Sequence, residues 1–390
     1  MKKKLLAAAV AGVLAAPVAM ADTGNVTIYG VANMSFDMTN NGNSTAGVAG
    51  TSTNKVSSNQ SRIGFKGSED LGGGTSAIWQ IEQQINMDNS TTNPNTFASR
   101  NSFIGLSDAT WGTVLMGRHD TPYKIATRGL DVFADTIADN RSLMGMSAGG
   151  LANTLTHTGI TGPFNHDTRV GDALAYVSPA MSGLTIAVGY VPGAELATTS
   201  TQIKGSAWSL AGMYNAGPIN ASLSYQAIDV GTTGTGTMGG MLLAAGDKGK
   251  AWKLGGGYTM DAFQVNLVYE KTTSSLTALA GGDGAAQNNW YLAGKYNVSA
   301  SDAVKLAYTK AGTNPQGAGT AVVAGSGAKQ VSLGYDHSMS KRTVLYALYT
   351  KLSNDSAATY VLSSVSTGSG ALPGAGASPS AWSLGLKHSF

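Results

Sequence analysis

The dominant pattern in this sequence is an alternation of apolar residues with polar or small residues, repeated in short segments along most of the chain. A period of two predicts β-strands that bury one face, whereas a helix would show a period near 3.6. Three segments share the template W-x-L-x-G-x-Y and begin at Trp208, Trp252 and Trp290. Degenerate copies begin at Val331 and Trp382. The chain therefore repeats one kind of strand.

Each complete copy of the template is followed by a short turn and a second alternating strand. After Tyr214, for example, Asn-Ala-Gly-Pro precedes a segment in which Ile219, Leu223 and Tyr225 share one face. Long polar stretches separate the resulting hairpins, at 229–249, 272–286 and 352–380. Short turns that alternate with long loops are typical of outer-membrane barrels, whose periplasmic turns are short and whose extracellular loops are long. A barrel also explains the alternation, since one face of each strand meets lipid and closure satisfies every backbone group.

The alternating segments predict an all-β fold, a 16-stranded antiparallel transmembrane β-barrel. The expected strands are 25–37, 60–69, 75–86, 100–108, 112–118, 172–179, 184–190, 206–216, 219–228, 250–260, 263–271, 287–298, 302–310, 329–339, 343–351 and 381–390. An even number of strands places both ends of the mature chain on the periplasmic side. A barrel of this size is too wide for its own side chains to fill, so it leaves an aqueous channel. A β-sandwich and a secreted β-helix are the competing folds, but they rarely combine so many strands with this spacing.

One connection breaks the rule of alternation. The segment 119–168 has no strand pattern, and among its small apolar residues stand Asp131, Asp135, Asp139, Arg128 and Arg141. A structureless segment of this length inside a compact barrel needs a function.

The N-terminus is typical of a secreted precursor. Three lysines at positions 2–4 precede a short apolar run, and Ala19-Met20-Ala21 fits the small-x-small cleavage signature. We therefore expect residues 1–21 to be a cleaved signal peptide and residues 22–390 to form the barrel in the outer membrane of a Gram-negative cell. The whole chain has 25 Lys and Arg against 22 Asp and Glu. Because the signal peptide removes three lysines, the mature chain is near neutrality, and nothing in its charge favours nucleic-acid binding.

Composition narrows the possibilities further. Charged residues make up only 12% of the chain, there are 52 glycines, and cysteine is absent, which excludes disulfide frameworks and thiolate sites. Gly234-Thr-Gly-Thr-Met-Gly239 matches a G-x-G-x-x-G pattern but lacks the βαβ context of a nucleotide site, so we expect a flexible loop. The five histidines show no paired metal-binding spacing. We expect no metal, no cofactor and no catalytic residue.

Several motifs resemble the trimeric general porins of Neisseria and other β-proteobacteria. They are Ser61-Arg-Ile-Gly-Phe-Lys-Gly-Ser-Glu-Asp-Leu-Gly72, Ala77-Ile-Trp-Gln-Ile-Glu-Gln83, Arg100-Asn-Ser-Phe-Ile-Gly-Leu106, Met116-Gly-Arg118, Arg169-Val-Gly-Asp-Ala-Leu-Ala-Tyr-Val-Ser-Pro179 with Ser182-Gly-Leu184, and the C-terminal Gly385-Leu-Lys-His-Ser-Phe390. Together they span the mature chain.

The resemblance implies a homotrimeric diffusion channel for ions and small hydrophilic solutes, with the third loop (119–168) folded inward as a constriction. In this family, arginines on the barrel wall face carboxylates on that loop. The matching wall positions are Arg62, Arg100 and Arg169, and the matching loop carboxylates are Asp131, Asp135 and Asp139. Lys66 is in phase with Arg62 and should also face water, while Arg118 marks the start of the loop. Ala175 stands where many relatives carry an arginine, so we expect only weak anion selectivity.

The resemblance also implies partners outside the channel. The terminal Phe390 is typical of the signal read by the barrel-assembly machinery, and the outer wall should contact outer-membrane lipid and lipopolysaccharide. An adhesin or receptor that acts through its long loops, and a barrel enzyme of the lipase or protease type, remain as alternative functions. A barrel enzyme would need Ser and His clustered near one rim, whereas His337 and His388 lie near the periplasmic strand ends.

Overall fold

The structure of the chain is a computed structural model. The structure describes residues 26–88, 97–145, 166–192, 205–229, 235–238, 241–244, 246, 248–275, 285–313, 324–362 and 374–390. The expected signal peptide, 1–21, lies outside the described residues. No helix among the described residues is long and apolar enough to cross a membrane.

Strands dominate the described chain, and they are connected in sequence order. Their bounds are β1 (Val26–Asn40), β2 (Ser52–Ser58), β3 (Arg62–Asp70), β4 (Thr75–Gln84), β5 (Ser102–Asp108), β6 (Gly112–Asp120), β7 (Arg169–Val177), β8 (Leu184–Val191), β9 (Ser206–Ala216), β10 (Ile219–Asp229), β11 (Thr235–Met238), β12 (Met241–Ala244), β13 (Lys248–Met260), β14 (Phe263–Ser275), β15 (Ala285–Asn297), β16 (Asp302–Ala311), β17 (Ala328–Ser338), β18 (Thr343–Asn354) and β19 (Ser380–Ser389). Between β6 and β7 lie a short helix, α2 (Pro122–Arg128), and a 3₁₀ turn, η1 (Asn140–Ser142).

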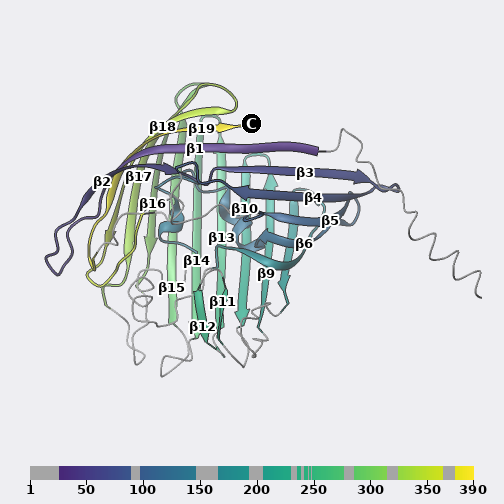
Figure 1. Cartoon of the computed structure of the whole chain (residues 1–390), viewed down its shortest axis with the longest axis horizontal. Coiled ribbons are helices and arrows are strands. Elements are labelled where there is room, and N and C mark those ends of the chain that lie inside the picture. Colours follow the sequence, from purple (N-terminus) through teal and green to yellow (C-terminus); the bar gives the residue numbers. More distant parts are fainter. Residues whose placement is uncertain are drawn as a thin grey trace, which may run out of the picture.

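The main sheet closes on itself because its first and last strands pair. It contains 17 strands, each antiparallel to its neighbours, and β1 pairs with β19 from Val31↔Ser389 to Asn40↔Ser380 (Figure 1). Both β2 and β3 pair with β1, one after the other, so they form a single barrel strand interrupted at Gln60, whose φ is +58°. The barrel therefore has sixteen strands, as the alternation predicts.

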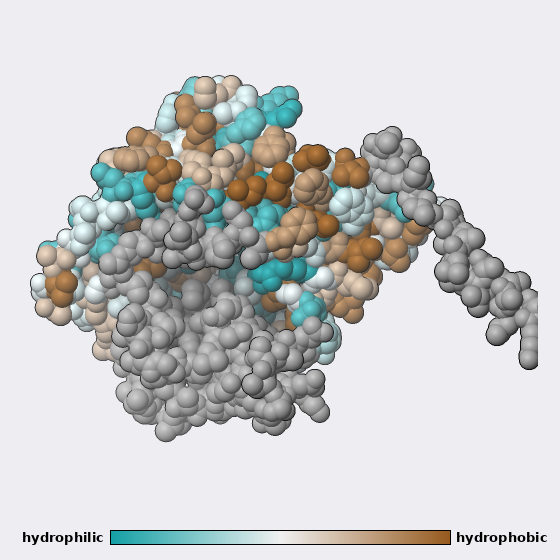
Figure 2. Space-filling model, viewed as in Figure 1, coloured by the Kyte–Doolittle hydropathy of each residue, from teal (hydrophilic) through white to brown (hydrophobic). Residues whose placement is uncertain are grey.

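The two faces of the barrel differ in the way a membrane requires. The residues of the repeated template point outward: Trp208, Leu210 and Tyr214 of β9 are 39–48% exposed. On the neighbouring strand β10, Ser222, Ser224 and Gln226 are buried on the inner face. The space-filling view shows hydrophobic side chains gathered on the outer wall near β1 and β3 (Figure 2). This arrangement confirms the predicted alternation, which places apolar side chains toward lipid.

Three details differ from the sequence-based expectations. The second barrel strand begins at Ser52 rather than at residue 60, and β7 begins at Arg169 rather than at residue 172. The polar stretch after β10, expected to be a flexible loop, contains the β11–β12 hairpin, which lies near the lower end of β13 and β14 in Figure 1. For the two strands the cause is the same: backbone pairing continues beyond the apolar band, where the side chains no longer alternate. The β11–β12 hairpin is a separate two-stranded sheet.

Candidate pore constriction

The segment after β6 enters the barrel and lies against one side of its inner wall. The helix α2 is capped by Thr121, whose hydroxyl accepts a hydrogen bond from the Lys124 backbone N–H, and Pro122 occupies the first turn, where no N–H is needed. The helix packs against β8, β9, β10 and β13. Pro122 lies so close to Gly189 of β8 that a Cβ there would be 3.0 Å from the proline Cδ. The wall is therefore built to receive this helix.

A buried polar cluster anchors the loop to β13 and β14. The Glu270 carboxylate, fully buried on β14, accepts hydrogen bonds from the Tyr123 hydroxyl (2.8 Å) and from the backbone N–H of Gly145 (2.9 Å). The Lys253 ammonium lies 3.4 Å from Glu270 and 3.3 Å from Asp167, and 4.4 Å from the centre of the Tyr123 ring. Since a buried charge is tolerated only when it is paired and hydrogen-bonded, this cluster fixes both ends of the loop to the wall.

An apolar cluster continues the contact toward β15–β18. Leu130, Phe133, Ile137, Leu143 and Met144 of the loop are buried together with wall residues that include Val268, Tyr291 and Leu348. The Phe133 ring fills the space over Gly334 of β17, where a Cβ would be 2.6 Å from the ring. The Asn266 amide donates to the Leu130 carbonyl (2.7 Å), and the Asn33 amide of β1 donates to the Asp135 carbonyl (2.9 Å). The loop thus crosses the barrel interior from β8 to β1.

The three predicted loop aspartates do not share one environment. The Asp131 side chain is only 1% exposed and accepts hydrogen bonds from the Tyr291 hydroxyl (2.9 Å) and from two backbone N–H groups. Asp139 is fully buried between the guanidinium groups of Arg128 (2.7 Å) and Arg141 (3.0 Å). Asp135 is 20% exposed and, of these three carboxylates, is the one that meets the arginine wall. Asp131 and Asp139 therefore hold the shape of the loop, and their carboxylates do not border the lumen as the sequence suggested.

The pKa values of these three aspartates also differ, because their neighbours differ. Burial, together with the neighbouring Asp139 carboxylate, raises the pKa of Asp131 to about 6. Burial alone would also raise the pKa of Asp139, but Arg128 and Arg141 hold that pKa well below its usual range. Burial would also raise the pKa of Asp135, but the charge of Arg128 outweighs burial, and the pKa of Asp135 is lowered. At neutral pH the loop therefore keeps Asp135 and Asp139 charged beside two arginines.

Opposite the loop, Arg62 and Arg100 share one acidic partner. Arg62 Nη1 lies 3.5 Å from Asp135 Oδ2, and its Nε lies 3.9 Å from Glu82 of β4. Arg100 forms a short ion pair with Glu82 and donates to the Gln60 side chain (2.6 Å). The wall arginines are thus oriented by Glu82, and Arg62 reaches across to the loop.

Arg169 and Arg118 continue this wall toward the base of the loop. Arg169 pairs with Asp120 of β6 (3.0 Å), and Asp120 also pairs with Lys124 (2.8 Å). Arg118 donates to the Ser99 carbonyl (3.0 Å) and, with Arg100, is close enough to Arg169 to interact with it electrostatically. A register shift between Gly117 and His119 alters the strand phase here. The structure thus brings the four predicted arginines to one side of the lumen.

Lys66 and Phe390 lie apart from this group. Lys66 lies four residues after Arg62 on the same face of β3. Its side chain is exposed, and its ammonium is 5.4 Å from the centre of the Tyr29 ring. Phe390 exchanges backbone hydrogen bonds with Gly30 of β1 (3.0 and 3.1 Å), which continues the pairing that closes the barrel.

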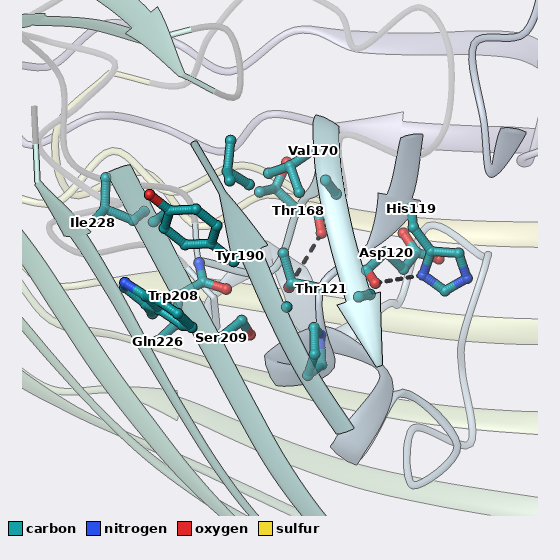
Figure 3. Close-up of a pocket in the computed structure, with 16 residues that line it drawn as sticks. His119, Asp120, Thr121, Thr168, Val170, Tyr190, Trp208, Ser209, Gln226 and Ile228 are labelled. Atoms are coloured by element: carbon teal, nitrogen blue, oxygen red, sulfur yellow. Dashed lines mark hydrogen bonds between the residues drawn. The ribbon is translucent and has the colours of Figure 1, made fainter. Parts of the chain in front are cut away.

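A small cavity lies between the start of the loop and the wall (Figure 3). Its volume is about 20 Å³, and its lining includes Ala173, Ala175 and Gly189 of the wall with Thr121 and Pro122 of the loop. Figure 3 shows Thr121 bonded to Thr168 across the loop base. Ala175 therefore faces the base of the loop from the wall, beside Thr121 and Pro122.

Sequence reasoning missed five charged residues of the site: Glu82, Asp120, Lys124, Arg128 and Arg141. Glu82 carried a usable signal, since it has the same parity as Gln80 and Gln84 on the polar face of its strand. Arg128 and Arg141 had none, because the loop has no periodicity from which to assign a direction to its side chains. Among the described residues, no group of His, Asp or Glu is arranged to hold a metal ion.

Comparisons with known proteins agree with this geometry. The family model described as Gram-negative porin matches residues 6–357. The outer membrane porin protein 32 of Delftia acidovorans is 27% identical over the full length of both chains. The major outer membrane protein P.IA of Neisseria meningitidis is 32% identical over 138 residues, which cover 35% of this chain and 30% of that protein. The solved structure of an anion-selective porin from Comamonas acidovorans superposes with a TM-score of 0.73 at 24% identity, covering 94% of this chain and 99% of that one.

Proposed function

Since the chain belongs to the Gram-negative porin family and forms an outer-membrane channel for passive diffusion, we propose that the charges around its inward loop make this channel weakly anion-selective. Arg62, Lys66, Arg100, Arg118 and Arg169 on the wall, with Asp131, Asp135 and Asp139 on the loop, are the residues that we assign to the constriction. Asp135 is its exposed carboxylate, and Asp131 and Asp139 act by holding the loop.

The observation that carries this proposal is an excess of basic side chains around the constriction. Eight bases, Arg62, Arg100, Arg118, Lys124, Arg128, Arg141, Arg169 and Lys253, stand against seven acids, Glu82, Asp120, Asp131, Asp135, Asp139, Asp167 and Glu270. Fixed charges in a narrow passage with low-dielectric walls act on a passing ion more strongly than the net charge of the whole chain. Rings of Arg and Lys favour anions, and the interleaved carboxylates reduce this preference without abolishing it.

Outside the channel, we propose that the protein is a homotrimer surrounded by lipid and lipopolysaccharide. Ala32 is a small residue at an outward position of β1, with Met34 and Phe36 on the same face, so two barrels could approach closely there. Phe390 would be the residue read by the barrel-assembly machinery, since it ends the strand that closes the barrel. Any binding by the long loops would be a second function of the same channel, and we propose no catalytic activity.

The experiment that tests the channel function is a planar-bilayer measurement of the purified mature protein. Stable pores that need no energy input are expected, and a protein that fails to conduct small ions would overturn the function. Selectivity is then read from reversal potentials in a salt gradient. The variant Arg62→Ser/Arg100→Ser should shift these potentials toward cations at 0.1 M salt, where the Debye length is about 10 Å, and less at 1 M salt, where it is about 3 Å. The matched control is Lys341→Ser/Arg342→Ser, which removes the same two positive charges from an exposed turn between β17 and β18. Unchanged potentials in the double variant would mean that these arginines do not line the narrowest point.

A further inference from the structure

A row of outward-facing lysines follows the extracellular ends of β13 to β18. It consists of Lys250, Lys271, Lys310, Lys329 and Lys351, which we call the lysine belt. Each of the five stands on its strand in phase with outward residues, such as Leu254 beyond Lys250 and Leu306 beyond Lys310, which are 53–55% exposed. The belt therefore lies on the outside of the barrel, on the side of the lipid and away from the channel.

Aromatic side chains fix the level of the belt in the membrane. Lys271 is paired across the sheet with Trp252, and Lys310 is paired with Trp290. The Tyr269 ring lies between these two tryptophans, 4.9 and 4.4 Å from them. Trp and Tyr collect where the hydrocarbon core meets the headgroups, and a lysine beside them can place its stem along the apolar surface and its ammonium among the headgroups. The belt is thus at the depth of the headgroups of the outer leaflet.

The positive charges of the belt lysines repel one another, and few acidic side chains among the described residues neutralise them. Lys310 and Lys329 are exposed and stand directly opposite each other on β16 and β17. Like charges directly opposite each other destabilise a sheet. Among the ion pairs of the described residues, one reaches this rim, between Lys248 and Asp229 (3.2 Å), and it involves none of the five belt lysines. An anion from outside the chain would relieve the repulsion.

The belt is confined to one side of the barrel. Strands β1 to β9 contain two lysines, Lys55 and Lys66. Lys55 is paired with Asp37, which is fully buried on the inner face, so Lys55 faces inward, and Lys66 shares the inner face with Arg62. The outward positions of those nine strands therefore carry no lysine. A general need for solubility at the rim would not produce this asymmetry.

We propose that the lysine belt binds the phosphate groups of lipopolysaccharide, with one phosphate bridging Lys310 and Lys329. This inference names the site for the lipopolysaccharide partner in the proposed function and rests on it. The glycolipid carries its phosphates at the headgroup level, and its acyl chains would lie against the exposed Leu254, Leu292, Leu306 and Leu333 below the belt. The charges and the apolar surface thus match the two parts of one molecule.

The test is a titration of the whole mature porin in detergent with purified lipopolysaccharide. The variant is Lys310→Gln/Lys329→Gln, and the control is Lys341→Gln/Arg342→Gln, which removes two charges from the turn between β17 and β18, at the opposite end of the wall. A lysine near an anionic membrane surface is worth about fivefold in binding, so the belt variant should bind about 25-fold more weakly and the control should bind as the unaltered protein does. Dephosphorylated lipopolysaccharide should bind the unaltered protein and the belt variant equally.

Three results would overturn the proposal: equal binding by the belt variant, an equal loss in the control, or undiminished binding of dephosphorylated lipopolysaccharide by the unaltered protein. Equally tight binding of phosphatidylglycerol, with the same loss in the belt variant, would assign the belt to phospholipid headgroups and also overturn it. Conductance measured on the same preparations separates this inference from the channel function. A belt variant that conducts normally is folded, so its binding result reports on the belt alone.

Discussion

Arg62 on the barrel wall and Asp135 on the inward loop lie 3.5 Å apart, between Nη1 and Oδ2, although 73 positions separate them in the sequence. This ion pair joins the two sides of the constriction. Asp135 also pairs with Arg128 of its own loop (2.7 Å), and its φ of +59° is a left-handed conformation that few aspartates adopt. The backbone is thus held in an uncommon shape at the point where the loop presents its carboxylate to the wall.

Removal of this carboxylate should strengthen the preference for anions. Asp135→Asn keeps the shape of the side chain and deletes one negative charge at the constriction. A unit charge about 8 Å from a passing ion in a water-like dielectric contributes about 0.5 kcal/mol, which is about a twofold change in relative permeability. Reversal potentials at low salt should therefore shift toward anions, opposite to the shift in Arg62→Ser. A shift toward cations would contradict the facing arrangement, and Asp70→Asn, at the exposed end of β3, provides the control.

Selectivity should also depend on pH through Asp131. Burial and Asp139 raise the pKa of Asp131 to about 6, above the ordinary value near 3.9. As pH falls from 7 to 5, the folded protein takes up a proton here, the loop loses a negative charge, and anion preference should increase. Because the folded state binds this proton more tightly than the unfolded state, the same change stabilises the docked loop as pH falls.

The measurement is the reversal potential between pH 7 and pH 5. Asp131→Asn should show the low-pH selectivity at both values, since its side chain is already neutral. A pH dependence that persists unchanged in this variant would show that Asp131 is not the group that titrates.

The anchor on β14 should determine how steadily the loop holds its position. Glu270→Gln would leave Lys253 with Asp167 as its one remaining acidic partner among the described residues and would weaken the bonds to Tyr123 and Gly145. Breaking a buried charge pair typically costs about 3–5 kcal/mol. We expect larger current fluctuations in the open channel while the barrel stays folded. Glu69→Gln, an exposed acid on β3, should leave the current unchanged, and a quiet Glu270→Gln channel would contradict the anchoring role.

Closure of the barrel should be sensitive to Gly30. A Cβ at this position would lie 2.3 Å from the Phe390 ring and 2.7 Å from the Arg62 carbonyl oxygen. Gly30→Val should therefore reduce the yield of folded barrel, at a cost of at least the roughly 1–3 kcal/mol of ordinary overpacking, because backbone as well as side chain must move. Heat-dependent mobility on gels measures the folded fraction. Gly212→Ala, with nothing near its Cβ, should fold normally, and normal folding of Gly30→Val would mean that this contact is not required.

The alternation along the chain was sufficient to predict the barrel, its antiparallel order and the outward direction of the repeated Trp, Leu and Tyr positions. A period of two assigns each strand residue to one of two faces. The apolar face then meets lipid and the polar face meets the water of the channel. The same parity placed Arg62 on the polar face. By itself, the sequence therefore determined the wall of the channel and the class of protein.

Only the tertiary structure decided what the inward loop does. The loop has no period, so nothing local indicates that Asp131 turns toward Tyr291, that Asp139 is buried between two arginines, or that Asp135 alone of the three meets Arg62. These directions depend on contacts with strands far away in the sequence, such as Glu270 and Gly334, whose roles appear only when the barrel has closed. The lysine belt shows the intermediate case. Parity predicts that each lysine faces outward, but the register that sets Lys310 opposite Lys329 is a property of the assembled sheet.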